Sequence, residues 1–113
     1  MADCIFCKIA NGEIPTNAVY EDDMMIAFND LEPQAPVHVL AIPKKHIESL
    51  DDVSSDDHAL LGHMMVKVQD IAKAAGIENG YRVVSNNGEN AFQTVKHLHL
   101  HILGNRKLTW PPG

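Results

Sequence analysis

The sequence predicts an α+β domain with about five short strands and one long helix. Residues 54–75 repeat apolar side chains at three- and four-residue steps, which is the pattern of an amphipathic helix. Strand-like segments lie on both sides of this helix and are separated by turn-forming residues. These segments are 18–21, 24–28, 37–42, 81–85 and 97–103. With 113 residues, the chain is expected to form one domain over residues 1–113.

The N-terminal half begins with a Cys-x-x-Cys pair in a segment that can form a single helical turn. Asn11-Gly12 and Pro15 are expected to end this turn. Asp22-Asp23 separates the first two strand segments, and because such residues favour tight connections we expect a hairpin there. Segment 37–42 is apolar at both parities, so both faces of that strand are expected to be covered.

The long helix has recognisable start and stop signals. Ser54 or Ser55 can cap its first turn, and Gly76 fits the position that follows a helix C-terminus. His58 and His63 fall outside the apolar stripe, so both are expected to face solvent.

The composition excludes several classes of function. The net charge of −6 argues against general binding to nucleic acid or to an anionic membrane, because both require a basic surface. No apolar run approaches the roughly 18–20 residues of a membrane-spanning helix, and no signal peptide is expected before Cys4. Two cysteines would make a thin disulfide framework, which favours a reducing, cytoplasmic location.

The stretch 97–103, His-Leu-His-Leu-His-Ile-Leu, predicts a functional site. Its period-two alternation indicates a strand that places His97, His99 and His101 on one face and the aliphatic residues in a core. Imidazole titrates near neutral pH, ligates metals and acts as a nucleophile. Two uses remain open on the residues alone: ligation of a catalytic metal together with a carboxylate such as Asp30, or nucleophilic attack on phosphorus by the central histidine.

Three further residues have alternative interpretations. Cys4 and Cys7 can be half of a zinc site, a redox pair or two ordinary thiols. His38 stands within the apolar segment 37–42, where it is either a hydrogen-bonded core residue or a support for the histidine-lined face.

These residues resemble a known family. The stretch 97–103 resembles the alternating histidine signature of the histidine triad (HIT) superfamily. Further segments along nearly the whole chain resemble its Hint branch, the histidine triad nucleotide-binding proteins. They are Ile5-Phe6, Phe28-Asn29-Asp30, Gln34-Ala35-Pro36, Ile42-Pro43-Lys44-Lys45-His46, Asn86 and Trp110-Pro111-Pro112-Gly113.

The resemblance implies a HIT fold: an antiparallel sheet with one long helix and a short N-terminal helix, whose sheets join across a homodimer. It implies a hydrolase that cleaves the P–N bond of purine nucleoside 5′-phosphoramidates, binds AMP or GMP, and requires no cofactor for catalysis. Trp110, a single Trp beside Pro-Pro, is expected to dock on its own domain or on a neighbouring subunit, and the resemblance favours the partner's site.

The resemblance also assigns roles to individual residues. His99 would be the nucleophile, His101 and the backbone around His97 would bind phosphate, and His38 would orient the histidines. Asp30 would bind the ribose hydroxyls. The remaining residues would form the purine pocket or face the phosphate: Phe6, Ile9, Phe28 and Leu31 for the base, and Asn86, Gln93 and Thr94 for the phosphate.

Two positions depart from the Hint pattern. Thr94 stands where Ser is usual, which keeps the hydroxyl but adds a methyl group. Phe92 stands where Gly is common, and a bulky side chain resists a positive φ at that position.

Zinc-carrying members of the superfamily imply a structural zinc on Cys4, Cys7, His46 and His97, a Cys2His2 set that suits tetrahedral Zn²⁺. Three other functions remain open. One is a regulatory module that binds nucleotide without selected turnover, and another is a dinucleoside polyphosphate hydrolase, which the Trp-Pro-Pro-Gly end disfavours. The third is a metalloenzyme that uses the triad as ligands.

Overall fold

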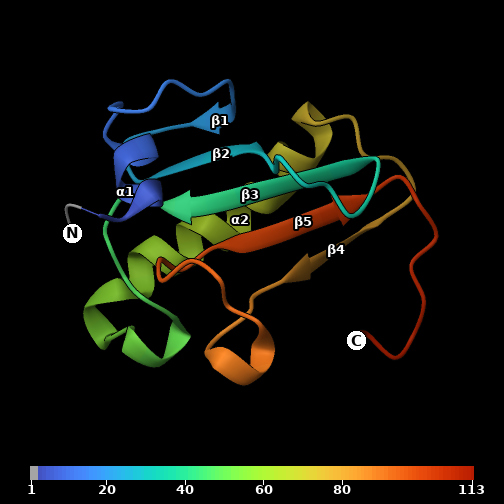
Figure 1. Ribbon diagram of the computed structural model, residues 1–113. Helices are drawn as coiled ribbons and strands as arrows, with labels where there is room; N and C mark the ends of the chain where they lie inside the picture. The colour runs from blue at the N-terminus through green and yellow to red at the C-terminus, as the bar shows by residue number, and fades with distance from the viewer. Residues whose placement is uncertain (1–2) are drawn as a thin grey trace.

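The computed structural model describes residues 3–113 and has the α+β architecture that the sequence predicts (Figure 1). Five strands form one antiparallel sheet in the order β1-β2-β3-β5-β4. The expected homodimer stays a prediction. The elements are α1 (Ile5–Ala10), β1 (Ala18–Glu21), β2 (Met25–Asn29), β3 (Val37–Pro43), α2 (His58–Ala74), β4 (Tyr81–Val84) and β5 (Leu100–Gly104), with short 3₁₀ turns at Leu50–Asp52, Ser55–Asp57 and Glu89–Ala91.

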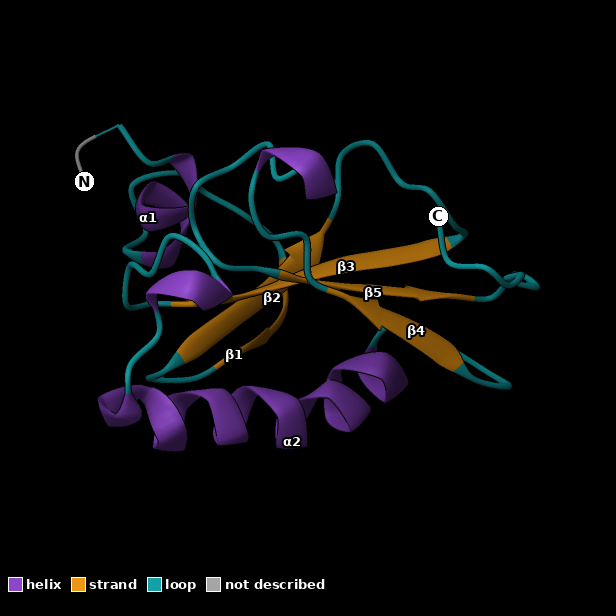
Figure 2. Ribbon diagram, turned by 90° about the horizontal axis from the view of Figure 1, so that it is seen from below, coloured by secondary structure: helices purple, strands orange, loops and turns teal. Residues whose placement is uncertain are grey.

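Helices cover both faces of the sheet, with α2 on one face and α1 on the other (Figure 2). Strand β3 lies at the centre and contributes to two apolar clusters. Val39 and Ala41 pack toward α2, whereas Leu40 and Ile42 pack toward α1. This confirms that both faces of the strand are covered, as its apolar residues at both parities predict.

Helix α2 begins later than the sequence predicts. Ser54 caps a 3₁₀ turn rather than the α-helix, because its side chain and that of Asp57 form a reciprocal capping box around Ser55–Asp57. The α-helix then runs over His58–Ala74. Gly76 follows it with φ +81°, a left-handed conformation that fits the predicted stop. No helix among residues 3–113 is long and apolar enough to cross a bilayer.

A polar cluster ties the predicted hairpin of β1 and β2 to α2. The Asp22 carboxylate accepts hydrogen bonds from the Met24 and Met25 N–H groups, at 2.8 and 3.0 Å, and from the Tyr20 hydroxyl at 2.7 Å. His63 of α2 lies 2.6 Å from the same carboxylate. The prediction that His63 simply faces solvent is therefore wrong, because Asp22 of the hairpin supplies it with a partner.

The C-terminal segment after β5 lies along the outside of the domain (Figure 1). Trp110 is 80% exposed, so it does not dock on its own domain. Docking of Trp110 on a partner subunit stays a prediction.

We expect Asp22→Asn to lower the free energy of unfolding by about 1–2 kcal/mol at pH 7, because the amide cannot accept from both Tyr20 and His63. Burial acts to raise the pKa of the Asp22 carboxyl, but its hydrogen bonds outweigh burial and hold the pKa well below its usual range. A lowered folded-state pKa stabilises the protein above the unfolded-state value, and this contribution is lost as the pH falls through the folded-state pKa.

Urea unfolding of wild type and Asp22→Asn at pH 7 and at low pH tests this prediction. The difference between the two proteins should shrink as the pH is lowered below the usual carboxyl range. Asp23→Asn is the matched control, because Asp23 is the exposed neighbour in the same turn. An Asp22→Asn variant as stable as Asp23→Asn at pH 7 would contradict the role given to this cluster.

Candidate active site

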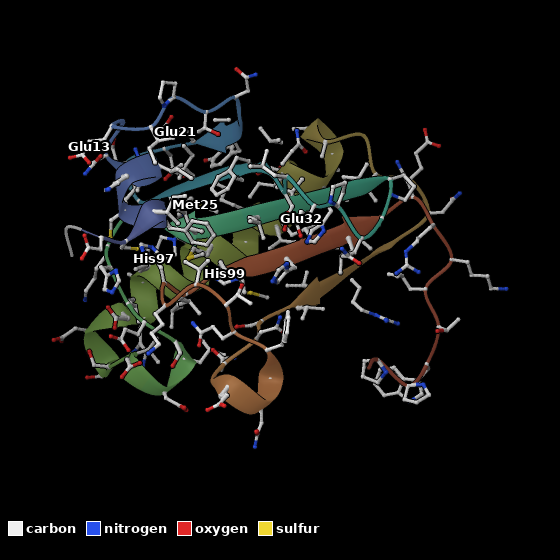
Figure 3. All side chains as sticks on the ribbon, viewed as in Figure 1. Glu13, Glu21, Met25, Glu32, His97 and His99 are labelled. Carbon is white, nitrogen blue, oxygen red and sulfur yellow. The ribbon has the colours of Figure 1, made fainter. Side chains whose placement is uncertain are left out.

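The strand that carries the histidines is shorter than the sequence predicts. Strand β5 covers only Leu100–Gly104, and residues 97–99 lead into it without strand pairing. The Leu98 N–H donates instead to the Ile47 carbonyl, at 2.6 Å. His97 and His99 still lie close together at the start of β5 (Figure 3). The prediction of a strand over 97–103 is therefore wrong for residues 97–99. The alternation itself is confirmed, because Leu98, Leu100 and Ile102 all enter the core on the α2 side.

His99 is held in a single tautomer. Its Nδ1 lies 2.7 Å from the His97 carbonyl oxygen, and because a carbonyl only accepts, Nδ1 carries the proton. The lone pair of neutral His99 is therefore on Nε2. The ring is 5% exposed, and the edge-to-face ring of Phe6 lies 5.2 Å from it, centroid to centroid. A positioned imidazole with a free Nε2 lone pair can act as a nucleophile.

His38 and His101 form a second hydrogen-bonded unit beside His99. The Gln34 N–H donates to His38 Nδ1 at 3.0 Å, so the His38 proton is on Nε2. His38 Nε2 lies 2.8 Å from His101 Nδ1 and donates to it, which leaves the His101 proton on its own Nε2. Within residues 3–113, that Nε2 is buried and lacks a hydrogen-bond partner. It is a donor available to a bound ligand.

Both rings of this unit stay neutral near pH 7. Burial lowers the pKa of His38, although the Asp30 carboxylate at 3.5 Å opposes the shift. Burial, together with the neighbouring His99 and His38, lowers the pKa of His101 to about 4. Neutral rings are what the tautomers require, because a protonated His38 would have no acceptor at Nδ1 for the Gln34 N–H.

The predicted base-binding residues are only partly brought together. Phe6, Ile9 and Phe28 belong to one apolar cluster on the α1 face, with the rings of Phe6 and Phe28 edge-to-face at 5.7 Å. Asp30 follows β2 and reaches His38. Leu31 is 96% exposed and lies outside the cluster.

The loop after β4 contains the three residues that are predicted to face phosphate. Asn86 comes two residues after Val84, whose Cα pairs with that of His101 across β4 and β5. Gln93 Oε1 accepts from the Gly88 N–H at 2.9 Å, and its Nε2 donates to the Glu48 and Val95 carbonyls at 2.6 and 3.1 Å. Gln93 therefore shapes this loop, and a phosphate contact from it would require exchange of one of these bonds.

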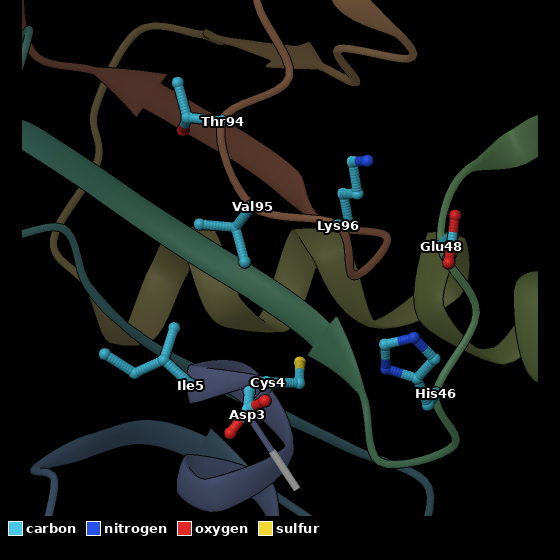
Figure 4. Close-up of a pocket in the computed structure, with 8 residues that line it drawn as sticks. All are labelled: Asp3, Cys4, Ile5, His46, Glu48, Thr94, Val95 and Lys96. Atoms are coloured by element: carbon cyan, nitrogen blue, oxygen red, sulfur yellow. The ribbon is translucent and has the colours of Figure 1, made fainter. Parts of the chain in front are cut away.

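Thr94 lines an open hollow of about 440 Å³ together with Val95 and Lys96 on one side and Cys4 and His46 on the other (Figure 4). Its side chain is exposed. The hydroxyl is therefore accessible to a ligand.

Phe92 adopts a positive φ, a conformation that is costly for a residue with a bulky side chain. It lies in the left-handed region at φ 62°, ψ 41°. Backbone hydrogen bonds hold it there: the Phe92 N–H donates to the Glu89 carbonyl and the Gln93 N–H to the Gly88 carbonyl, at 3.0 and 3.1 Å. The loop thus keeps a turn that favours glycine while carrying a phenyl ring that is 79% exposed.

The four predicted metal ligands converge below α1. Cys4 and Cys7 Sγ lie 3.3 and 3.5 Å from His97 Nδ1, and Cys7 Sγ lies 3.2 Å from His46 Nδ1. His97 Nε2 donates to the Pro43 carbonyl at 2.8 Å, so the Nδ1 lone pair faces both sulfurs. Tetrahedral Zn²⁺ requires sulfur and nitrogen ligand atoms about 3.5 Å apart, so the donor set and its spacing fit this ion.

Several contacts in this site have no signal in the sequence. The Gln34 N–H, the Pro43 carbonyl and the Ile47 carbonyl are backbone groups, which no side-chain pattern marks. Arg106, whose Nε donates to the Gln34 carbonyl at 2.9 Å, lies outside the histidine signature. The segment Gln34-Ala35-Pro36 was visible only as part of the family resemblance.

Comparisons with known proteins agree with this geometry. A family model described as "Scavenger mRNA decapping enzyme C-term binding" matches residues 3–109. An uncharacterized HIT-like protein of Synechocystis sp. is 55% identical over 98% of this chain and 97% of its own length. A second uncharacterized HIT-like protein, from Synechococcus elongatus, is 52% identical over the same shares.

Solved structures are similar over nearly the whole chain. A HIT family hydrolase from Legionella pneumophila superposes with a TM-score of 0.93 at 51% identity, covering 98% of this chain and 100% of its own. A histidine triad protein from Clostridium difficile gives 0.91 at 52% identity, with 96% of each chain covered. With this similarity and the buried histidine cluster, the chain belongs to the HIT family and is a hydrolase of the HIT type.

Proposed function

We propose that the protein hydrolyses the P–N bond of purine nucleoside 5′-phosphoramidates through a nucleotidyl intermediate on His99. The observation that carries this proposal is that an imidazole lone pair and an imidazole N–H lie on neighbouring histidines. His99 presents a lone pair on Nε2, while the neighbouring His101 presents a buried N–H donor without a partner in the described chain. A nucleophile beside a preorganised donor suits attack on an anionic phosphorus centre.

In the proposed first step, His99 Nε2 attacks phosphorus, a bond from Nε2 to phosphorus forms, and the P–N bond to the amine breaks. The amine nitrogen takes up one proton from solvent and leaves as a neutral amine, and the Thr94 hydroxyl would relay that proton. The His99 ring becomes positively charged, and its Nδ1–H bond to the His97 carbonyl stabilises that charge. His101 Nε2–H donates to a phosphoryl oxygen as charge develops. Water then attacks phosphorus, a P–O bond forms and the P–Nε2 bond breaks. One proton of the water returns to solvent, and the nucleotide and neutral His99 are released.

Groups that suit a nucleotide lie on the same surface and support the proposal. The apolar cluster that contains Phe6, Ile9 and Phe28 offers a site for a purine base, and Asp30 offers a carboxylate for ribose hydroxyls. Leu31, exposed as it stands, would be covered by the bound base. AMP and GMP both meet these requirements. The phosphate needs no basic field, because neutral donors suit an anion of low charge.

We further propose that Cys4, Cys7, His46 and His97 hold a structural Zn²⁺. The ion would fix the N-terminal turn to the histidine segment, and none of the steps above passes through it. Free thiols at Cys4 and Cys7 are consistent with the reducing, cytoplasmic location that we propose.

A homodimer is the proposed assembly. Three apolar side chains exposed on α2 and β4 would be covered by a partner subunit that packs on these two elements. They are Met65, Val66 and Tyr81. Trp110, exposed on its own chain, would contact the partner's site.

We expect His99→Ala to lower the rate of AMP release from an adenosine phosphoramidate by about 1,000-fold or more, because the nucleophile is lost. AMP affinity, measured by calorimetry, should change only a few-fold. Each protein is assayed with and without a chelator, and wild-type turnover should survive chelation.

Other outcomes of this assay point to other functions. Turnover that stops on chelation would favour a metalloenzyme. Absence of turnover in every sample, with AMP still bound, would favour a regulatory nucleotide-binding module.

Zinc binding has its own test. Purified wild type should contain about one zinc per chain by elemental analysis, and removal of zinc should lower Tm, because the ion links distant segments. His46→Ala should lose the zinc. His58→Ala is the matched control, because His58 is exposed at the start of α2 and lies outside the ligand set. Equal zinc content in both variants would refute the proposed ligand set.

A further inference from the structure

The loop between β2 and β3 approaches the histidines through a backbone group. The Gln34 N–H donates to His38 Nδ1 at 3.0 Å, and His38 is buried at 5% exposure. A backbone amide always carries its hydrogen in the ordinary pH range, so it can only donate. Unlike a hydroxyl or an imidazole, this partner cannot adapt to the other tautomer of His38.

One fixed donor therefore determines two further proton positions. His38 must accept at Nδ1, so it donates from Nε2 to His101 Nδ1 at 2.8 Å. His101 must then carry its own proton on Nε2, the buried nitrogen that lacks a partner in residues 3–113. In the opposite tautomer of both rings, His101 Nε2 would carry a lone pair, which repels a phosphoryl oxygen. The orientation of the Gln34 N–H, which belongs to the Pro33–Gln34 peptide, thus decides whether His101 is a donor or an acceptor for the substrate.

The Gln34 segment is held in place from outside its own loop by Arg106. Arg106 Nε donates to the Gln34 carbonyl at 2.9 Å, across 72 positions of sequence. Arg106 lies two residues beyond β5, and the Cα of Gly104 at the end of β5 pairs with that of Val37 at the start of β3. The guanidinium therefore links the segment after β5 to the loop whose Gln34 N–H donates to His38. The loop's own contacts are short-range: Gln34 Nε2 donates to the Glu32 carbonyl and the Glu32 N–H to Asp30 Oδ1.

We propose that the Gln34 N–H sets the tautomers of His38 and His101, and that Arg106 is a positioning residue that keeps this N–H aimed at His38. Arg106 itself touches no reacting atom. It holds the Gln34 carbonyl, whereas the N–H belongs to the preceding peptide group, so Arg106 acts by fixing the main chain on both sides of the Gln34 Cα. Its effect on turnover rests on the function proposed above. The tautomers themselves can be measured without any assay of that function.

The first experiment reads the proton positions directly. Long-range ¹H–¹⁵N NMR of the full chain, labelled with ¹⁵N, distinguishes protonated from unprotonated imidazole nitrogens. We expect His38 and His101 each to be protonated only at Nε2. A scalar coupling across the hydrogen bond should join the Gln34 amide nitrogen to His38 Nδ1. Detection of either ring as the Nδ1–H tautomer would overturn the proposal.

Gln34→Pro removes the N–H group, whereas Gln34→Ala retains it and removes only the side chain. We expect Gln34→Pro to give mixed tautomers at His38 and His101, and Gln34→Ala to keep the pure Nε2–H forms. Pure Nε2–H forms in Gln34→Pro would refute the role of the N–H. If Gln34→Pro does not fold, the scalar coupling and tautomers of wild type still decide that role.

The role of Arg106 is tested with Arg106→Gln, and Lys107→Gln is the matched control, because Lys107 is the next exposed cation along the chain. We expect Arg106→Gln to speed amide exchange at Gln34 and to populate the second tautomer of His38. Turnover of an adenosine phosphoramidate should show a kcat lowered about 5- to 10-fold, the effect of one hydrogen bond, with AMP affinity within about twofold of wild type. Lys107→Gln should match wild type in all three readouts.

The outcomes separate this inference from the proposed function. Lower kcat in Arg106→Gln with unchanged tautomers and amide exchange would overturn the positioning role, and so would tautomers identical to those of Lys107→Gln. If wild type shows no turnover at all, the proposed function fails, but the tautomers and exchange rates still test the inference.

Discussion

The arrangement of the site depends on His97, whose two ring nitrogens and carbonyl are all engaged. Its Nε2 donates to the Pro43 carbonyl at the end of β3, its Nδ1 faces Cys4 and Cys7, and its carbonyl accepts from His99 Nδ1. The ring is fully buried. Because the same residue contacts the N-terminal turn and fixes the tautomer of His99, the proposed nucleophile, displacement of His97 would disturb both at once. Burial in a low-dielectric environment also lowers the pKa of His97, so the ring stays neutral and keeps its Nδ1 lone pair.

The neutral histidines of the site bear on how an acidic protein would bind the proposed phosphate ester. The chain carries a net charge of −6, and a site built on protonated imidazoles would have to keep buried positive charges. Burial lowers the pKa of His38 and His101 instead, so each ring has one donor and one acceptor. Directed hydrogen bonds then supply what positive charge would supply in a basic site, at the cost of depending on the correct tautomer at each ring.

The sequence predicts the architecture well, because the apolar periodicities of β3 and α2 reflect burial that the fold requires. It fails where backbone groups decide the outcome. The strand prediction for 97–103 assumed regular pairing, but Leu98 pairs with Ile47 in a loop, and alternation of side chains does not reveal this. His63 looked solvated because its partner, Asp22, lies 41 positions away in a turn. The histidines of the site were marked by their alternation and most other site residues by the family resemblance. The proton positions of the histidines depend on the Pro43 carbonyl, which any residue would supply, and on the Gln34 N–H, which any residue except proline would supply.

Phe6 contacts both the histidines and the apolar cluster that is proposed to bind the base. It lies between Cys4 and Cys7 in the chain, and its ring meets those of Phe28, His97 and His99 edge-to-face, with centroids 5.7, 6.0 and 5.2 Å away. The same short helix and its N-cap therefore carry the two proposed sulfur ligands and one wall of the proposed base pocket. A helix of six residues has little stability of its own, so its position must come from its contacts. A metal at the sulfurs would hold Phe6 in place, and through Phe6 it would shape the base pocket without taking part in the chemistry.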